Sequence, residues 1–299
     1  MGITSVERET GLKKETLRVW ERRYGFPAPI RDDRGERLYP AEQVQRLRLI
    51  KRLLDQGLRP GRVVPACPEE LTALAEAACD CLPAPPPPQA CCDCLTLLAT
   101  NQADAVRGSL QQQLARAGLQ RFVLETVAPL TTQVGLAWMR GEIQVHQEHL
   151  YTEQVQNVLR GAIAAAGTPR SRPRVLLTTL PEEPHGLGLL MVEAMLVPEG
   201  VYCLSLGTRT PHSDICEAAR AGGFDIVAVS FSAAVPLRNA WEALLDVRSQ
   251  LDPGVQMWAG GGLLAGRPGN SEAVRVFGGL EELPGAIAAW RDAHPGVPG

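Results

Sequence analysis

Val175-Leu-Leu-Thr-Thr179 runs directly into Leu180-Pro-Glu-Glu-Pro-His-Gly-Leu-Gly188, and this stretch decides the fold class. A short β-branched run that feeds a Gly-containing loop and then a helix predicts the first strand and helix of a doubly wound α/β domain. The loop has the pattern acidic-x-His-x-x-Gly. Its His185 can ligate a metal through one ring nitrogen and donate a hydrogen bond to Glu183 through the other. The sequence therefore predicts a metal-ligating loop at a strand end.

The residues after this loop continue the alternation of strands and helices. Ser230 and Ser232 follow one expected strand, and Gly260 and Gly261 follow another. Because parallel sheets bind ligands outside the carboxyl ends of their strands, we expect these residues to share one rim with the His185 loop. The expected fold is a Rossmann-like (flavodoxin-like) parallel sheet with strands at 174–179, 201–207, 225–231 and 255–259 and helices at 188–198, 211–221 and 236–250.

Two proline-containing breaks divide the 299 residues into modules. Leu82-Pro-Ala-Pro-Pro-Pro-Pro-Gln89 cannot form a helix or a central strand and predicts a semi-rigid polyproline spacer. Gly167-Thr-Pro-Arg-Ser-Arg-Pro173 separates a helical segment from the first strand. We therefore expect a multi-domain chain of the α and α/β classes, with an N-terminal domain at 1–66, a Pro-rich linker at 67–93, a helical bundle at 94–168 and the parallel sheet at 173–299.

The composition is that of a globular protein whose charge is unevenly distributed. Hydrophobic residues make up 45% of the chain, and no apolar run approaches the roughly 20 residues of a membrane helix. There is no apolar signal segment, and the eight Cys favour a reduced chain, so we expect a cytoplasmic protein without a membrane partner. Residues 1–66 carry a net charge of +6 and the rest −9, which indicates a polyanionic partner at the N-terminal end.

The N-terminal module predicts a helix-turn-helix followed by a basic hairpin. Residues 5–11 and 13–24 predict two short helices joined by a Gly-containing turn. The Pro/Gly-rich stretch 25–39 predicts a wing whose arginines contact phosphates, and 40–54 predicts an amphipathic helix. The candidate DNA-binding residues are Lys13, Lys14, Thr16, Arg18, Arg22, Arg23 and Tyr24 on the second helix and Arg31, Arg34, Arg37 and Tyr39 on the wing.

This module resembles the MerR family of winged-helix transcription regulators. The matching pieces are Thr-Leu-Arg-x-Trp-Glu-Arg at 16–22, Arg37-Leu-Tyr39 at the end of the wing, and the Leu-x-x-Ile helix that follows. The resemblance implies binding to operator DNA, and a solvated basic face on a small helical domain is the alternative. The long dimerisation helix of the family is absent, so pairing with a second copy must use another part of the chain.

The middle module predicts four amphipathic helices with short turns, which is the pattern of a four-helix bundle. Trp138 ends one helix, and after nine intervening residues Glu148 and His149 open the next. These three side chains could therefore converge at one end of the bundle. The alternative is a core Trp beside a surface Glu-His pair, which is the commoner use of these residue types.

Spacing gives the loop at 183–188 a more specific interpretation. Gly188 is separated by 41 residues from Ser230, and Ser232 by 27 residues from Gly260. An acidic-x-His-x-x-Gly loop, a Ser-x-Leu and a Gly-Gly at these spacings resemble the cobalamin-binding domain of methionine synthases and mutases, although Ser232 stands at the Leu position. A loop His in an ordinary flavodoxin-like domain is the alternative.

The resemblance implies a role for each residue of the rim. His185 would replace the cofactor's own dimethylbenzimidazole as the lower cobalt ligand, and Glu183 would hold the other ring nitrogen. The displaced nucleotide tail would enter a slot between the sheet and a helix. Small residues at the strand ends would line that slot, namely Ser230, Ser232, Ala233, Gly260 and Gly261, and Gly186 and Gly188 of the loop are further candidate cofactor-binding residues.

With cobalamin implied, Trp138 and the Glu148-His149 pair resemble the helical cap of the CarH/LitR-type cobalamin-binding photoreceptor regulators. The resemblance implies that Trp138 packs on the adenosyl group of adenosylcobalamin and that Glu148 hydrogen-bonds it. It also implies that His149 takes the upper cobalt site once the alkyl group leaves. Met139 stands where some light-sensing members have His, so cofactor binding is more firmly implied than photochemistry.

The resemblances together imply a light-responsive, cobalamin-dependent repressor that binds operator DNA as an adenosylcobalamin-loaded homotetramer and comes apart in light. Two alternatives stay open: a light-independent sensor of cobalamin or another chromophore, and a corrinoid carrier for a methyltransferase or mutase. The DNA-binding head and the lack of a substrate barrel argue against the carrier and against an enzyme. An incidental role and metal or disulfide chemistry both stay open for Cys79, Cys81, Cys91, Cys92 and Cys94.

Overall fold

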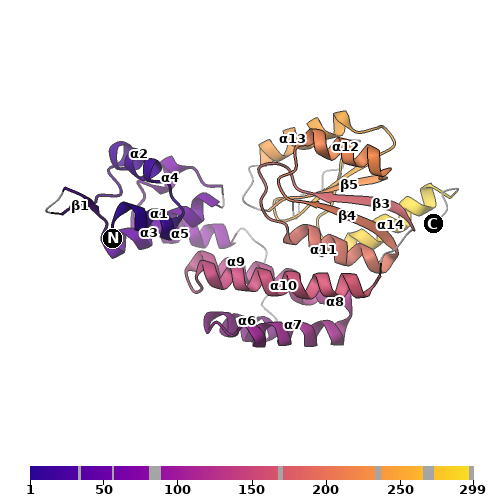
Figure 1. Ribbon diagram of the computed structural model, residues 1–299, viewed down its shortest axis with the longest axis horizontal. Helices are drawn as coiled ribbons and strands as arrows, with labels where there is room; N and C mark the ends of the chain where they lie inside the picture. Colours follow the sequence, from indigo (N-terminus) through magenta and orange to yellow (C-terminus); the bar gives the residue numbers. More distant parts are fainter. Residues whose placement is uncertain are drawn as a thin grey trace. The chain divides into compact units, whose positions relative to one another are not determined.

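The computed structural model describes residues 1–32, 35–55, 57–80, 89–167, 171–232, 237–264 and 273–295 (Figure 1). The chain forms two compact units. The first consists of Met1–Pro83 and Gly135–Gln144, and the second of Ala84–Val134 and Val145–Gly299. Within the described ranges, no helix has both the length and the apolar character that crossing a membrane would require.

The first unit begins with a winged helix-turn-helix, which confirms the fold predicted for this part of the chain. Its elements are α1 (Ile3–Thr10), α2 (Lys14–Tyr24), β1 (Ile30–Arg31), β2 (Arg37–Leu38), α3 (Ala41–Asp55), α4 (Pro60–Val63) and α5 (Pro68–Asp80). Helix α2 ends at Gly25, whose φ of 71° is a left-handed conformation that glycine adopts at little cost. The two strands pair antiparallel to form the wing, and Leu17, Trp20 and Leu47 are buried in the core of this unit.

Helix α5 occupies part of the stretch expected to be a linker. The sequence predicts a linker over 67–93, but residues 68–80 form this helix and another helix begins at Gln89. Pro68 suits the first turn of a helix, where its missing N–H costs nothing, and Leu71 is fully buried in the same core as α3. The proline run at 82–88 lies outside the described residues, so its polyproline conformation stays a prediction.

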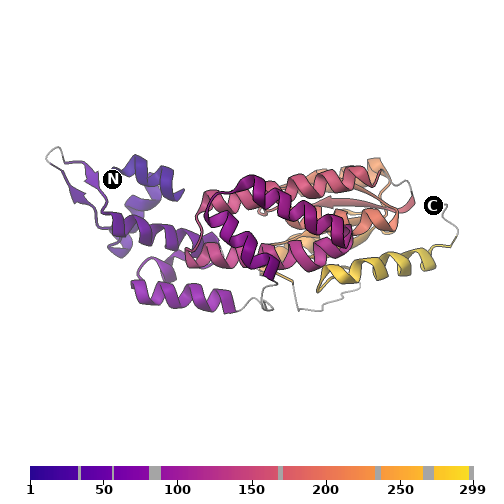
Figure 2. The same ribbon diagram turned by 90° about the horizontal axis from the view of Figure 1, so that it is seen from below.

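The second unit begins with the predicted helical bundle. It contains α6 (Gln89–Ala99), α7 (Ala103–Ala117), α8 (Leu119–Phe122), a π-helical turn η1 (Val123–Val127), α9 (Ala128–Arg140) and α10 (Val145–Ala165). Figure 2 views the bundle with α6 and α7 toward the reader. Arg107 Nε donates to Gln154 Oε1 at 2.7 Å, which ties α7 to α10. The division between the two units falls within α9, after Val134.

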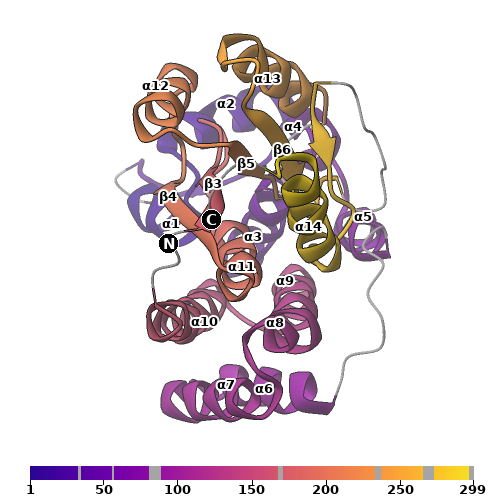
Figure 3. The same ribbon diagram turned by 90° about the vertical axis from the view of Figure 1, so that its right-hand side faces the viewer.

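A five-stranded parallel sheet completes the second unit. Its elements are β3 (Ser171–Thr178), α11 (Leu187–Leu196), η2 (Val197–Glu199), β4 (Val201–Gly207), α12 (His212–Gly222), β5 (Ile226–Ser230), α13 (Leu237–Gln250), β6 (Gln256–Gly260), β7 (Arg275–Val276), η3 (Leu280–Glu282) and α14 (Leu283–Ala293). The strand order β4-β3-β5-β6-β7 is flavodoxin-like and confirms the predicted class. Helices α12 and α13 cover one face of the sheet, and α11 and α14 cover the other (Figure 3).

The direction of the strand order reverses at β3, and this reversal positions the candidate site. The chain leaves β3 toward β4 on one side, and β5 lies on the other side. Ligands of doubly wound sheets bind in the crevice at such a switch point. The loop at 180–186 follows β3, and Ser230 at the end of β5 pairs in register with Gly260 at the end of β6. The predicted residues therefore share one rim.

Candidate functional site

Glu183 connects two loops at the carboxyl ends of β3 and β5. It is only 1% exposed. Its Oε1 accepts hydrogen bonds from the His185 backbone N–H at 2.9 Å and from His185 Nδ1 at 2.6 Å, and its Oε2 accepts from the Ser232 backbone N–H at 2.6 Å. Burial by itself raises the pKa of Glu183, but these hydrogen bonds outweigh burial and lower the pKa below the ordinary value. The residue is therefore a buried, ionised carboxylate.

The carboxylate fixes the orientation and tautomer of His185. Because the Nδ1–H is donated to Glu183, the lone pair suited to a metal is on Nε2, and the side chain is 60% exposed. No cluster of three or more His, Cys, Asp or Glu side chains suited to a metal occurs in the described part of the chain. A metal bound at His185 would therefore bring its remaining ligands with it. Cobalamin would meet this requirement, because its cobalt is carried in a ring that supplies other ligands, and His185 would hold it.

Gly188 and Ser230 form a cradle of small residues beside this loop. A methyl group added to Gly188 would lie 2.3 Å from Ser230 Oγ, so with serine at 230 a larger residue would force α11 or the Ser230 side chain to shift. At Gly186, a methyl group would lie 3.1 Å from Thr208 Cγ2. Both positions therefore carry small residues, as a cobalamin tail bound beside them would require.

The two predicted glycines at and after the end of β6 differ in whether the backbone requires glycine at that position. Gly261 has a φ of +106°, and a methyl group on it would lie 2.2 Å from the Phe231 carbonyl oxygen. Gly260 has room for a methyl group, whose nearest neighbour would be Phe277 Cβ at 3.7 Å. Gly261 is therefore required by the backbone itself, whereas the role predicted for Gly260 concerns the cofactor alone.

Two threonines at the end of β3 were missed by sequence reasoning; Thr179 supports the His185 loop, and Thr178 supports the loop that follows β4. Thr179 Oγ1 donates to the Glu183 carbonyl at 2.6 Å and accepts from the Arg209 backbone N–H at 2.9 Å. Thr178 Oγ1 donates to Thr210 Oγ1 at 2.8 Å. Both threonines are fully buried. Their position at the end of a buried strand was the available signal, because a buried hydroxyl requires a hydrogen-bond partner.

Glu148 and His149 form a second carboxylate–histidine pair, at the start of α10. Glu148 Oε2 lies 2.8 Å from His149 Nδ1, and Glu148 Oε1 accepts from Thr152 Oγ1 at 2.9 Å. The His149 side chain is 72% exposed. As at His185, a carboxylate engages Nδ1, and Nε2 is the nitrogen suited to a metal.

Trp138 lies in the first unit, among residues 135–144. Its neighbour there is Arg52 of α3, whose guanidinium carbon lies 5.5 Å from the centroid of the indole ring. Glu148 and His149 belong to the second unit, so the convergence of the three cap residues stays a prediction. The side chain of Met139 lies outside the described residues.

Most of the predicted DNA-binding residues are available on the surface of α2 and the wing. Lys13, Arg18, Arg22, Arg23 and Arg31 are exposed, and Lys14, Thr16, Tyr24 and Arg37 are partly exposed. Lys14 pairs with Glu7 at 3.5 Å, and Arg37 pairs with Glu21 at 2.9 Å. Tyr39 is 1% exposed, so it would support the wing from the core rather than touch DNA directly. Arg34 lies outside the described residues.

Comparisons with known proteins match each part of this chain. Residues 1–69 match the MerR HTH family regulatory protein model, residues 173–287 match a B12 binding domain, and residues 93–160 match a second B12 binding domain. The HTH-type transcriptional repressor CarH of Myxococcus xanthus is 34% identical over 278 residues, which cover 91% of this chain and 93% of that protein. The chain belongs to the CarH-like family of MerR regulators with B12-binding domains.

Further likenesses agree with membership of the CarH-like family. The HTH-type transcriptional repressor CarA of Myxococcus xanthus is 28% identical over 235 residues, covering 77% of this chain and 75% of that protein. The Methanosarcina barkeri monomethylamine corrinoid protein shares the fold, with a TM-score of 0.51 and 14% identity over 66% of this chain and 96% of that one. The two B12-domain matches contain the Glu183–His185 pair and the Glu148–His149 pair.

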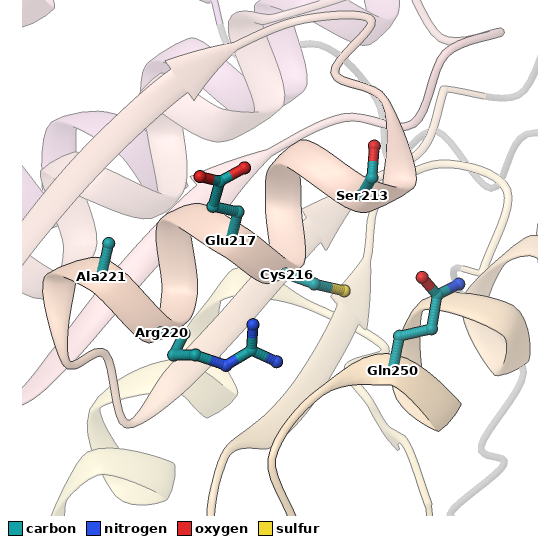
Figure 4. Close-up of a pocket in the computed structure, with 6 residues that line it drawn as sticks. All are labelled: Ser213, Cys216, Glu217, Arg220, Ala221 and Gln250. Atoms are coloured by element: carbon teal, nitrogen blue, oxygen red, sulfur yellow. The ribbon is translucent and has the colours of Figure 1, made fainter.

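A surface pocket on α12 and α13 lies apart from the residues predicted for the CarH-like functions (Figure 4). Burial raises the pKa of its Cys216 thiol, which stays protonated at neutral pH. No predicted cofactor or DNA-binding residue lines it. Its lining residues are Ser213, Cys216, Glu217, Arg220, Ala221 and Gln250.

Proposed function

We propose that this protein is a cobalamin-dependent transcriptional repressor that binds operator DNA through its winged helix and responds to light through adenosylcobalamin. The MerR and B12 domain matches and the 34% identity to the repressor CarH support this proposal. One observation carries the cofactor assignment: the buried Glu183 holds His185 Nδ1 at 2.6 Å beside the Gly188–Ser230 cradle. That arrangement prepares a single imidazole nitrogen for a metal that carries its other ligands with it.

In this proposal each residue of the rim has a separate task. His185 would ligate cobalt, and Glu183 would keep the ring in the tautomer that can do so. Gly188 and Ser230 leave room for the nucleotide tail, as do Gly186, Ser232, Gly260 and Gly261. Adenosylcobalamin, when bound, supplies a cobalt–carbon bond that light breaks.

The cap residues complete the proposed sensor from the upper side. Trp138 would stack on the adenosyl group, and Glu148 would accept a hydrogen bond from it. His149 would ligate cobalt once the adenosyl group has left. Its Nδ1 lies 2.8 Å from Glu148, which supports Nε2 as the ligating atom. Assembly of copies into a homodimer or homotetramer would place two winged helices on one operator, because paired domains match two half-sites.

The lower ligand is tested by comparing two histidines that have the same kind of partner. His185 Nδ1 and His212 Nδ1 each lie 2.6 Å from a carboxylate, Glu183 and Asp246 respectively. Purified protein should bind adenosylcobalamin with the absorption spectrum of a His-ligated cobalt. The His185→Ala variant should lose that spectrum, and the His212→Ala variant should keep it. Retention of the spectrum by His185→Ala would reject the ligand assignment.

A second candidate function is a light-independent sensor of cobalamin. Met139 favours it, because the resemblance to light-sensing members of the family implies His at this position. Such a sensor would bind cobalamin through the same rim but would keep its assembly and its DNA affinity under illumination. Comparison of dark and illuminated protein separates the two candidates.

A further inference from the structure

Arg52 of the DNA-binding domain and Trp138 of the predicted cofactor cap contact each other within the first unit. The guanidinium carbon lies 5.5 Å from the centroid of the indole ring. A methyl group added to Gly141 would lie 3.1 Å from Arg52 Nη1, so the guanidinium also reaches the turn after α9. The contact therefore involves the end of α9 and the turn that follows it.

The surroundings of the two side chains favour a cation–π interaction. Burial lowers the pKa of Arg52, with a smaller contribution from Arg48, yet arginine stays charged at any physiological pH. A partly desolvated guanidinium is attracted to the face of an indole more strongly than a fully hydrated one. Trp138 Nε1 is buried, and within the described part of the chain no acceptor reaches it. The indole is thus held by ring contacts rather than by a hydrogen bond.

This environment overlaps with the role proposed for Trp138 in the loaded protein, because Arg52 already lies over the indole ring. Stacking on an adenosyl group covers a whole face of the indole, whereas here the ring is already half-buried against its own unit. If the adenosyl group stacks on the face that Arg52 covers, Trp138 must give up its contact with Arg52. A ligand that requires the loss of an existing contact binds more weakly by the free energy of that contact.

We propose that Arg52 competes with adenosylcobalamin for Trp138, so that a side chain of the DNA-binding domain sets the affinity of the sensor for its cofactor. This inference rests on the proposed function. By thermodynamic linkage, the factor by which Arg52 weakens cofactor binding equals the factor by which the cofactor weakens the Arg52–Trp138 contact. Cofactor binding would thereby release α3 from the end of α9, which gives the DNA-binding domain a direct signal.

The affinity of the full chain for adenosylcobalamin, measured in the dark and without DNA, tests the competition. Arg52→Met removes the charge but keeps a side chain of similar size. It should lower the dissociation constant for adenosylcobalamin by about two- to five-fold, which corresponds to the free energy of one partly exposed cation–π contact. Arg52→Lys keeps a cation and should stay closer to wild type. Arg48→Met is the matched control, because Arg48 lies one turn away on α3 and pairs with Glu9 instead; its affinity should match wild type.

A measurement without cofactor tests the contact itself. The protein is labelled with 5-fluorotryptophan, and the ¹⁹F resonance of Trp138 is assigned by its loss in Trp138→Phe. That resonance should move in Arg52→Met and stay in place in Arg48→Met, while the resonances of Trp258 and Trp290 report that the second unit is still folded.

The outcomes separate this inference from the proposed function. If wild-type protein does not bind adenosylcobalamin, the proposed function fails, and the competition fails with it. If wild type binds and Arg52→Met binds equally or more weakly, the competition alone is overturned. An unmoved Trp138 resonance in Arg52→Met would likewise overturn it, because the contact would then be absent in solution.

Discussion

At the scale of single residues, Gly188 of α11 packs closely against Ser230 of β5. We expect Gly188→Ala to lower stability by about 1–3 kcal/mol, the usual cost of forcing an extra methyl into a packed site, because it would meet Ser230 Oγ. Chemical denaturation measures this cost, and the affinity for adenosylcobalamin should fall as well. Adding Ser230→Ala removes the Oγ and should restore much of the stability, since the next nearest atom, Ser230 Cβ, would lie at 3.4 Å.

A helical glycine with open space is the control for this change. Gly161 on α10 has no atom within 4 Å of an added methyl group. Gly161→Ala should therefore be neutral or slightly stabilising, because alanine has the higher helix propensity. Equal losses at Gly188 and Gly161 would contradict the cradle, as would the absence of rescue by Ser230→Ala.

At the scale of elements, α2 is the part of the wing domain expected to enter the DNA groove. Arg18 and Arg22 are both exposed and lie one turn apart on this helix. If each contacts a phosphate, Arg18→Ala and Arg22→Ala should each weaken operator binding and reduce the slope of log affinity against log salt by about 1. Fluorescence anisotropy at several salt concentrations measures both quantities.

Arg18→Ala and Arg22→Ala each remove a positive charge, so the experiment needs a control variant that removes one outside the winged helix. Arg121 lies on α8 in the bundle and pairs with Glu125 at 2.9 Å. Arg121→Ala changes the net charge of the chain by the same amount and should leave the salt slope unchanged. A slope that changes equally in all three variants would show that only overall charge matters, and α2 would lose its assignment.

Most of the elements follow from local sequence, and the exceptions have physical reasons. β3, β5 and β6 are apolar runs followed by loops, so period and length identify them. β7 has only two residues, too few to show a period, and its place at the sheet edge depends on pairing with β6. Helix α14 could have been predicted, because Pro284 stands in its first turn and Leu283, Ile287 and Trp290 form a buried stripe.

At the candidate site, residue types and their spacing could be used for prediction, but most hydrogen-bond partners could not be predicted from the sequence. The pattern acidic-x-His-x-x-Gly indicated that Glu183 would hold His185, and the structure joins them at 2.6 Å. Nothing in the sequence indicates that Glu183 also binds the Ser232 backbone, because that bond depends on how close the ends of β3 and β5 lie. The neighbour of Trp138 was equally hidden, since Arg52 is far from it in the sequence.

At the scale of the whole molecule, the proposed repressor predicts that light changes both assembly and DNA affinity. Protein loaded with adenosylcobalamin in the dark should elute from a sizing column as a larger species than cofactor-free protein and should bind operator DNA. Green light should convert it to a smaller species and weaken DNA binding by about ten-fold or more, within the usual range of allosteric coupling. Protein loaded with hydroxocobalamin, which has no cobalt–carbon bond, should not respond to light. Identical behaviour of the adenosylcobalamin form in dark and light would favour the light-independent sensor.

The first unit is built from two separate segments of the chain, and this limits which truncations and chimaeras preserve it. Residues 135–144 belong with Met1–Pro83 although more than fifty residues separate them in the sequence. A fragment that ends at the proline run would lack this returning segment, and Arg52 would lose its indole neighbour. In a chimaera that exchanges only residues 1–83, the new N-terminal domain would have to pack against residues 135–144 of the other protein. A chimaera that exchanges residues 1–83 and residues 135–144 together would keep the whole first unit from one protein.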